Sequence, residues 1–254
     1  MNKVRVLSSF EPVIEFFRLL FETVSYSVLP PYRVSDIFKQ INYIAIQSAP
    51  VVILCLAFAS VVVIIEASFH MKLVIQNDAL VPGFASLLIL RELGAVVTAL
   101  LVTSRVGAGL AAEVGTMKVT DQLDALKMLN IDPVRYLVVP RFIASLVSGA
   151  LLTVIANVFC LYCAMLVSQL KLGYTPGAFL MSMRAFVEMK DLYFSIIKGV
   201  AFFSVIPIMS CFYGFRCKAG AEGVGLATTG SVVATSVTII FLDFLLTWIF
   251  SYMY

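Results

Sequence analysis

Two adjacent charged residues, Arg91 and Glu92, stand between apolar runs that are each too short to cross a membrane alone. Charged side chains at membrane depth are costly, so they usually face a polar cavity or a counter-charge. A guanidinium binds phosphate well because its planar fork of donors matches phosphate oxygens. One hypothesis is that both residues form a polar substrate site in a translocation cavity. The alternative is an interhelical ion pair, with Lys198 or Asp243 contributing the counter-charge.

A second polar stretch, residues 113–130, separates two apolar runs. Its charged and amide side chains are Glu113, Lys118, Asp121, Gln122, Asp124 and Lys127. Between them lie Val114 and four further apolar residues, which recur at helical spacing and form one strip: Met117, Leu123, Leu126 and Leu129. The pattern predicts an amphipathic helix. It fits a solvated helix on the membrane surface and a docking helix for a cytoplasmic partner equally well.

Other chemistries have little support in the sequence. No G-x-x-x-x-G-K-[ST] occurs, so we expect no ATP site of the P-loop kind, and the chain has no Ser-His-Asp, paired-carboxylate or metal-binding constellation. Cys160 and Cys163 form a C-x-x-C inside an apolar run, where small packing residues are the better interpretation than a redox or metal site. The one histidine, His70, falls at the end of a run. We therefore expect no catalytic role, no metal, and no nucleic-acid partner.

The composition places the chain among polytopic membrane proteins. Hydrophobic residues make up 61% and charged residues 13% of its 254 residues, against about 45–50% and about 25% in soluble domains. The basic start of the chain acquires Glu11 and Glu15 before an adequate apolar core, so no cleavable signal peptide is expected. We predict an all-α membrane protein with a single domain over residues 1–254.

The elements that must position the polar residues follow from the apolar runs. Five transmembrane helices are predicted, at residues 44–65, 79–104, 142–170, 192–215 and 231–252. Before them, Glu11, Glu15, Arg18 and Glu22 share one stripe of a helix over residues 10–29, which predicts an amphipathic helix lying in the membrane interface. Pro30-Pro31 stops that helix. Residues 171–191 form a mixed loop with a short helix, and residues 216–230 form a glycine-rich connection.

The distribution of basic residues orients these spans. With the N-terminus inside, twelve Lys and Arg residues fall on the inner side and five on the outer, while Arg91 is intramembrane. Because cytoplasmic segments carry the excess of positive charge, the N-terminus and residues 105–141 are predicted to be cytoplasmic and the C-terminus periplasmic.

The central stretch resembles a known family. The runs R-E-L-G, R-V-G-A, A-A-E-V-G-T-M-K-V-T-D-Q-L-D-A-L and D-P-V-R-Y-L-V-V-P-R, together with the C-terminal block from Cys211, are similar to the MlaE/YrbE permeases. These are membrane subunits of MCE-type ABC transporters that move phospholipid between bacterial membranes. The similarity extends in order over about residues 40–254.

The resemblance implies a homodimer in the bacterial inner membrane with a phospholipid cavity, which Arg91 and Glu92 would line. It also implies a cytoplasmic coupling helix between spans 2 and 3. On this sequence that helix is residues 113–130, and its ATPase-facing motif holds Glu113, Gly115, Thr116, Lys118, Asp121 and Gln122. ATP and magnesium would be bound by the partner ATPase and no cofactor by this chain. A periplasmic MCE-domain protein and a small accessory cytoplasmic subunit are the other implied partners.

Three positions differ from the family pattern. Ala95 stands where proline is usual, Ser104 replaces a glycine, and Gly230 replaces a basic or bulky residue. They bear on the shape of the cavity and leave the coupling motif intact.

Two other hypotheses stay open. One is a stand-alone ion-coupled carrier that uses Lys198 and Asp243 with the Arg91-Glu92 pair, although the hydropathy shows no inverted repeat. The other is a non-transporting scaffold.

Overall fold

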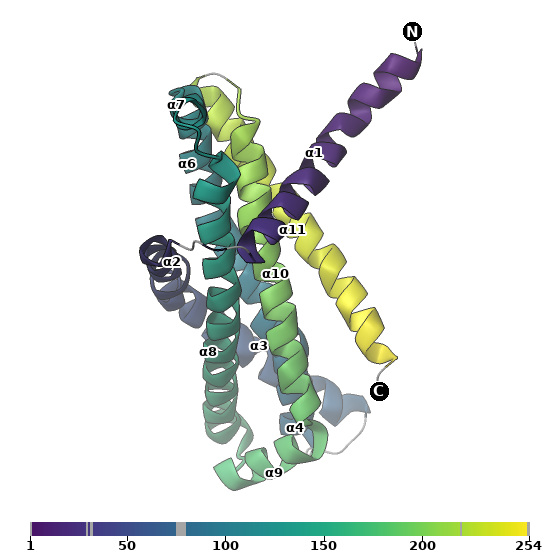
Figure 1. The fold of residues 1–254 in the computed structure, drawn as a ribbon. Coiled ribbons are helices and arrows are strands. Elements are labelled where there is room, and N and C mark those ends of the chain that lie inside the picture. Colours follow the sequence, from purple (N-terminus) through teal and green to yellow (C-terminus); the bar gives the residue numbers. More distant parts are fainter. Residues whose placement is uncertain (1, 29, 31–32, 75–79, 219, 253–254) are drawn as a thin grey trace. The chain divides into compact units, whose positions relative to one another are not determined.

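The computed structural model describes residues 2–28, 30, 33–74, 80–218 and 220–252. Within these ranges the chain is helical and contains no strand (Figure 1). The α-helices are α1 (Asn2–Val28), α2 (Val34–Ile41), α3 (Ala49–Val74), α4 (Val81–Leu88), α5 (Thr98–Val102), α6 (Ala108–Val119), α7 (Gln122–Met128), α8 (Val139–Leu172), α9 (Pro176–Phe186), α10 (Met189–Phe215) and α11 (Ala221–Ser251). Wider π-helical segments join several of them: η1 (Asn42–Ile46), η3 (Ile89–Val97), η4 (Thr103–Gly107) and η5 (Val134–Val138).

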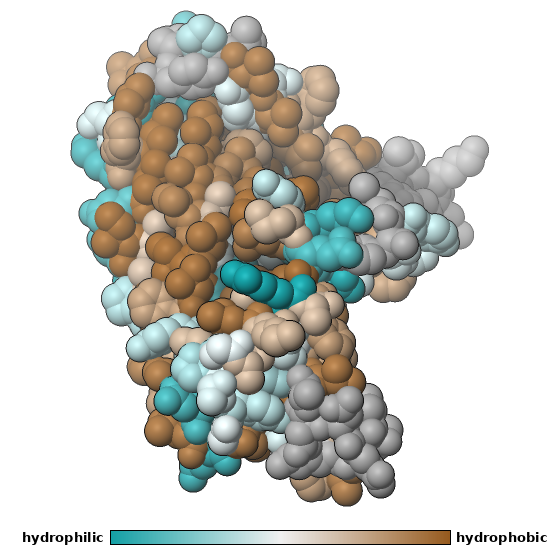
Figure 2. Space-filling view, turned by 90° about the horizontal axis from the view of Figure 1, so that it is seen from below, coloured by the Kyte–Doolittle hydropathy of each residue, from teal (hydrophilic) through white to brown (hydrophobic). Residues whose placement is uncertain are grey.

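Five helical segments of the described chain are long and apolar enough to cross a membrane, which makes this an all-α, multi-pass membrane protein. They are Val34–Met71, Val81–Val119, Val134–Leu172, Met189–Phe215 and Ala221–Ser251. Large hydrophobic side chains lie exposed along them, as the brown face in Figure 2 shows. Such a surface suits a hydrocarbon solvent rather than water.

Each of the five predicted spans falls on one of these segments, and the helices extend well beyond the predicted spans: the first begins at Val34, the second ends at Val119, the third begins at Val134 and the fifth begins at Ala221. The helix that contains the second span continues past residue 104, the predicted end of the span, to Val119. No proline interrupts residues 105–119, and small residues such as Gly107 pack closely there. At 39 residues this helical segment is about 58 Å long, against about 30 Å for a hydrocarbon core. It is therefore longer than a hydrocarbon core is thick. Ala79, where this span was predicted to begin, lies outside the described residues.

The glycine-rich connection is also shorter than predicted. Gly220 has a φ of +90° and ends the turn, and α11 begins at Ala221. Gly223 lies in the first turn of α11, where a Cβ would collide with the Lys218 carbonyl, so this position needs a glycine.

The predicted interfacial helix lies within α1, which starts at Asn2 rather than at residue 10. Its polar stripe pairs Arg18 with Glu22 at 2.8 Å, and Glu15 pairs with Arg216 at 3.0 Å. Leu29, Pro31 and the side chain of Glu11 lie outside the described residues. The interfacial position of α1 stays a prediction.

The chain divides into two compact units, and each crossing segment contributes to both. Unit 1 comprises residues 1–44, 103–146 and 204–237. Part of its core lies between α1, α6, α8 and α10 and is formed by Leu19, Val114, Val138, Phe142, Ile208 and Cys211. Gly214 allows close approach there, since a Cβ at this position would meet Val114.

Unit 2 comprises residues 45–102, 147–203 and 238–254. In it α4 packs on α9, where Gly83 lies against Phe186 and its N–H donates to the Ser182 hydroxyl at 3.0 Å. The short helix predicted between residues 171 and 191 is confirmed as α9. It begins because the Thr175 hydroxyl accepts a hydrogen bond from the Ala178 N–H and Pro176 occupies the first turn.

Candidate functional site

Five charged residues of the crossing segments come together in unit 2. The π-helical segment η3 carries Arg91 and Glu92, α10 carries Asp191 and Lys198, and α11 carries Asp243. The helix is not broken at Arg91 and Glu92. The helix instead widens into π turns over Ile89–Val97, a deformation that is frequent at functional sites. We call these five residues the charged cluster.

Arg91 pairs with a residue that the sequence analysis missed. Its Nε lies 2.7 Å from Asp191 Oδ1, and the Asp191 side chain is completely buried. The other oxygen of Asp191 accepts a hydrogen bond from the Glu188 N–H at 2.9 Å. Arg91 also lies over the ring of Phe250, at 5.5 Å from its centroid. Asp191 thus holds the guanidinium while 31% of the Arg91 side chain remains exposed.

Lys198 joins the other two carboxylates. Its Nζ lies 3.1 Å from Glu92 Oε1 and 2.6 Å from Asp243 Oδ1, and it donates to the Arg91 carbonyl at 3.1 Å. The Lys198 side chain is fully buried, whereas Glu92 is 43% exposed. The alternative of an interhelical ion pair is therefore present: Lys198 pairs with Glu92 and Asp243, whereas Arg91 pairs with Asp191.

Uncharged residues fix the helices that carry the cluster. Phe194 and Phe250 stack with centroids 3.8 Å apart, and Lys198 lies 5.0 Å from the Phe194 centroid. Next to the cluster, Asn157 donates to the Ser195 hydroxyl at 2.9 Å and fills the space where Gly94 lacks a Cβ. The absence of a side chain at Gly94 lets the polar Asn157 approach the segment that carries Arg91.

The arrangement presents one cation and one anion to the exterior. Arg91 and Glu92 keep exposed surface, and their partners Asp191 and Lys198 are buried beneath them. With all five groups ionised, two cations face three carboxylates. The exposed part of Glu92 can accept a positively charged or hydrogen-bonding ligand group. The exposed part of Arg91 can donate to a phosphate. Among the residues that the structure covers, no group of His, Cys, Asp and Glu has metal-binding geometry.

The predicted coupling segment lies in unit 1, and its form differs from the prediction. The sequence pattern predicted one helix over residues 113–130. Instead α6 ends at Val119, Asp121 adopts a left-handed φ of 57°, and the separate helix α7 covers Gln122–Met128, beside α6 (Figure 1). Aspartate tolerates this conformation better than most residues. The apolar spacing continues on both sides of the turn, so the sequence pattern does not reveal where α6 ends and α7 begins.

The residues of the predicted ATPase-facing motif separate into exposed and buried ones. Glu113, Thr116, Asp121 and Gln122 are exposed, and Lys118 is partly exposed at 3.5 Å from Asp124. In contrast, Gly115 is buried against Cys217 and Val224, where it serves packing.

Two features of this segment were not predicted. Glu113 pairs with the buried Arg141 at 2.8 Å, and Arg141 also donates to the Cys211 sulfur at 3.8 Å. At the far end of α7, Met128 and Leu129 are 87% and 71% exposed, and Leu129 belongs to the predicted apolar strip. Of the apolar residues named for this segment, only Val114 and Leu123 are buried.

The two cysteines of the C-x-x-C take different positions. Cys160 is buried and donates to the Leu56 carbonyl at 3.5 Å, whereas Cys163 is partly exposed. Both are free thiols.

Comparison with known proteins points to one family. Residues 37–249 match the family described as Permease MlaE. A probable ABC transporter permease protein of Rickettsia typhi is 36% identical over 227 residues, which cover 89% of this chain and 87% of the relative. A probable ABC transporter permease protein of Synechocystis is 34% identical over 83% of this chain and 80% of its own length. The intermembrane phospholipid transport system permease protein MlaE of Haemophilus influenzae is 33% identical, with 82% and 80% covered.

Proposed function

Since this chain belongs to the MlaE permease family and is a membrane permease of an ABC transporter, we propose that it moves phospholipid between the inner and outer membranes. The H. influenzae relative is named for intermembrane phospholipid transport. The single observation that carries the proposal onto this chain is the charged cluster. A partly exposed guanidinium, held by a buried carboxylate at membrane depth, suits the phosphate of a lipid.

The head group would contact Arg91 and Glu92, while Asp191, Lys198 and Asp243 hold them in place. A buried carboxylate pairs with Arg91 and a buried ammonium with Glu92. Such partners fix the direction of each charged group before a ligand arrives, which lowers the cost of ordering on binding. Two copies of the chain would enclose the lipid in a cavity.

ATP hydrolysis would be carried out by a partner chain, with ATP and magnesium bound there. This sequence has no P-loop motif. The surface offered to the ATPase would be the end of α6 and α7, with Glu113, Thr116, Lys118, Asp121 and Gln122, and with Gly115 packing beneath them. Met128 and Leu129 add exposed apolar area to it, which is typical of a docking surface.

The excess of Lys and Arg on one side supports an inner-membrane topology with a cytoplasmic N-terminus and a periplasmic C-terminus. A periplasmic MCE-domain protein and a small accessory cytoplasmic subunit would complete the assembly.

A second candidate function is ion-coupled transport without ATP. The observation that favours it is Lys198, a buried cation shared by two carboxylates, because intramembrane carboxylates and cations can relay protons. The two candidates differ in what drives the movement of the substrate.

A transfer assay separates them. The complex with its ATPase is reconstituted in vesicles that contain labelled phospholipid, and transfer to acceptor vesicles is followed with ATP or with a proton gradient. We expect transfer with ATP alone, its loss in Arg91→Ala, and its retention in Arg184→Ala, which removes an exposed arginine of α9. Transfer driven by the gradient without ATP would support the carrier. Equal transfer by wild type and Arg91→Ala would remove Arg91 from the lipid site.

A further inference from the structure

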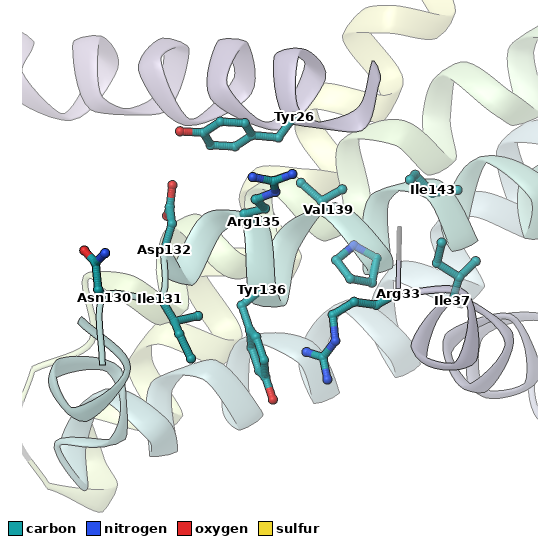
Figure 3. A pocket seen from close by; sticks show the side chains of 11 residues that line it. Tyr26, Arg33, Ile37, Asn130, Ile131, Asp132, Arg135, Tyr136, Val139 and Ile143 are labelled. Carbon is teal, nitrogen blue, oxygen red and sulfur yellow. The ribbon is translucent and has the colours of Figure 1, made fainter. Parts of the chain in front are cut away.

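A cavity of about 360 Å³ lies in unit 1 between the end of α1, the start of α2 and the first turns of the third crossing segment. Figure 3 shows its lining. Tyr26 extends over Arg135, and Asn130 and Asp132 lie at one end, with Ile37 and Ile143 at the other. None of its residues belongs to the charged cluster or to the coupling motif.

The polar end of the cavity is rich in donors. Arg135 donates to the Pro30 carbonyl at 3.0 Å and lies 6.0 Å from the Tyr26 centroid. No carboxylate of the described chain lies within ion-pair distance, 4.0 Å, of Arg135. Arg33 lies 4.1 Å from the Tyr136 centroid and does have an acidic partner, Asp36, at 2.9 Å.

The carboxylates near the cavity are already engaged. Asp36 is shared by Arg33 and by Lys39, whose Nζ lies 3.7 Å away. Asp132 accepts a hydrogen bond from the Val134 N–H at 2.9 Å and lies beside Tyr26, where it raises the pKa of the phenol. Of the charged residues that line the cavity, two are cations, Arg33 and Arg135, and one is a carboxylate, Asp132, so the lining carries an excess of positive charge.

The lining changes from polar to apolar along the third crossing segment. Asp132, Arg135, Tyr136, Val139 and Ile143 recur at helical spacing, so they share one face. The crossing segment runs from Val134 to Leu172, so Val139 and Ile143 lie nearer its middle than Arg135 does. The polar part of the cavity is therefore nearer the end of the segment, and the apolar part is nearer the middle of the segment.

We propose that this cavity binds a phosphate-bearing lipid of the surrounding leaflet, with its phosphate on Arg135 and the start of its acyl chains along Val139 and Ile143. The guanidinium supplies the charge-assisted donors that a phosphate diester accepts. A lining that is polar at one end and apolar at the other favours a lipid over free phosphate, because free phosphate has no apolar part to contact Val139 and Ile143. The bound lipid joins α1 and α2 to α8, and its site shares no residue with the charged cluster.

Photolabelling tests this proposal. The permease is reconstituted in phosphatidylcholine nanodiscs that contain a phosphatidylglycerol with a photoreactive head group, and labelled peptides are mapped. We expect labelling within residues 130–143. Loss of one charge-assisted hydrogen bond in Arg135→Gln should lower it about tenfold. Lys218→Gln, which removes an exposed cation from the connection between α10 and α11, should leave it unchanged.

A second variant keeps every charge. Ile143→Trp fills the apolar end of the cavity, so it should also lower the labelling. This variant tests the proposal independently if a thermal unfolding scan shows that Arg135→Gln is not folded. Labelling unchanged in both variants, or labels spread evenly over the crossing helices, would mean a nonspecific lipid shell and would overturn the proposal. Displacement of the label by inorganic phosphate at equal concentration would identify a free-phosphate site instead.

Discussion

The ammonium of Lys198 lies 2.6 Å from the carboxylate of Asp243, and the Lys198 side chain has no exposed surface. Glu92 reaches the same ammonium from another helix at 3.1 Å. One buried cation therefore holds together three helical segments of unit 2. A buried charge that loses its partner is costly, so substitutions in the cluster should change the stability of the protein measurably.

Replacing Lys198 by Met should destabilise the protein strongly. The change leaves Glu92 and Asp243 facing each other without a cation, and breaking a buried pair costs about 3–5 kcal/mol. Thermal unfolding in detergent measures the loss. Lys190→Met is a matched control on α10, because Lys190 is exposed and pairs with an exposed Glu188, a kind of pair that contributes about 0–1 kcal/mol. The double variant Lys198→Met with Asp243→Asn should recover part of the stability, and its failure to do so would argue against the pairing.

Gly94→Ala should destabilise the same unit by steric conflict. A Cβ at this position would occupy the space of the Asn157 amide group, and such overpacking costs about 1–3 kcal/mol. Gly225→Ala is the control, because nothing lies within 4 Å of a Cβ there and alanine favours a helix. Removing the obstacle with Asn157→Ala should restore the stability of the Gly94→Ala variant. If the double variant is no more stable than the single one, the contact does not limit packing.

The sequence predicted those features of the fold and the site that have a local cause. Five apolar runs predicted five spans, and Arg91 and Glu92 were evident because charges are rare in such runs. Asp191 was missed for the opposite reason. It lies at the polar start of a span, beside Lys190 and Glu188, where a carboxylate is unremarkable in composition. Its role follows only from packing against Arg91, 100 positions earlier in the chain.

The coupling segment shows the same limit. Apolar spacing continues from Val114 to Leu129, so a single helix was predicted. The turn at Asp121 depends on one backbone angle, and an aspartate there is compatible with a helix as well as with a turn. Leu129, the last residue of the predicted strip, stands directly after the end of α7 and is exposed.

The ion pairs of α7 should respond to acid. The hydrogen bond from Lys127, and then the charges of Lys118 and Lys127, lower the pKa of Asp124. The folded state therefore favours the ionised carboxylate. Its contribution is complete above the pKa of the unfolded chain, about 3.9, and is lost as the pH falls through the lower folded-state pKa. Carboxyl ¹³C shifts of Asp124 should report that pKa, and Lys127→Gln should raise it toward the ordinary value. An unchanged titration in Lys127→Gln would mean that the contact is not formed.

The turn between α6 and α7 should matter for the ATPase through its shape. Asp121 is exposed, has a φ of 57° and makes no side-chain cap of α7. We therefore expect the turn to depend on the backbone conformation of this residue rather than on its carboxylate. Asp121→Gly keeps that conformation and should retain the ATPase in co-purification. Asp121→Val should weaken binding about tenfold, because a left-handed conformation costs an ordinary side chain about 1–2 kcal/mol and the helix would shift to avoid it. Asp121→Asn, which tolerates the same φ and lacks the charge, should behave like the glycine variant. If Asp121→Gly and Asp121→Asn both lose the ATPase while α7 keeps its helical amide shifts, the carboxylate itself contacts the partner.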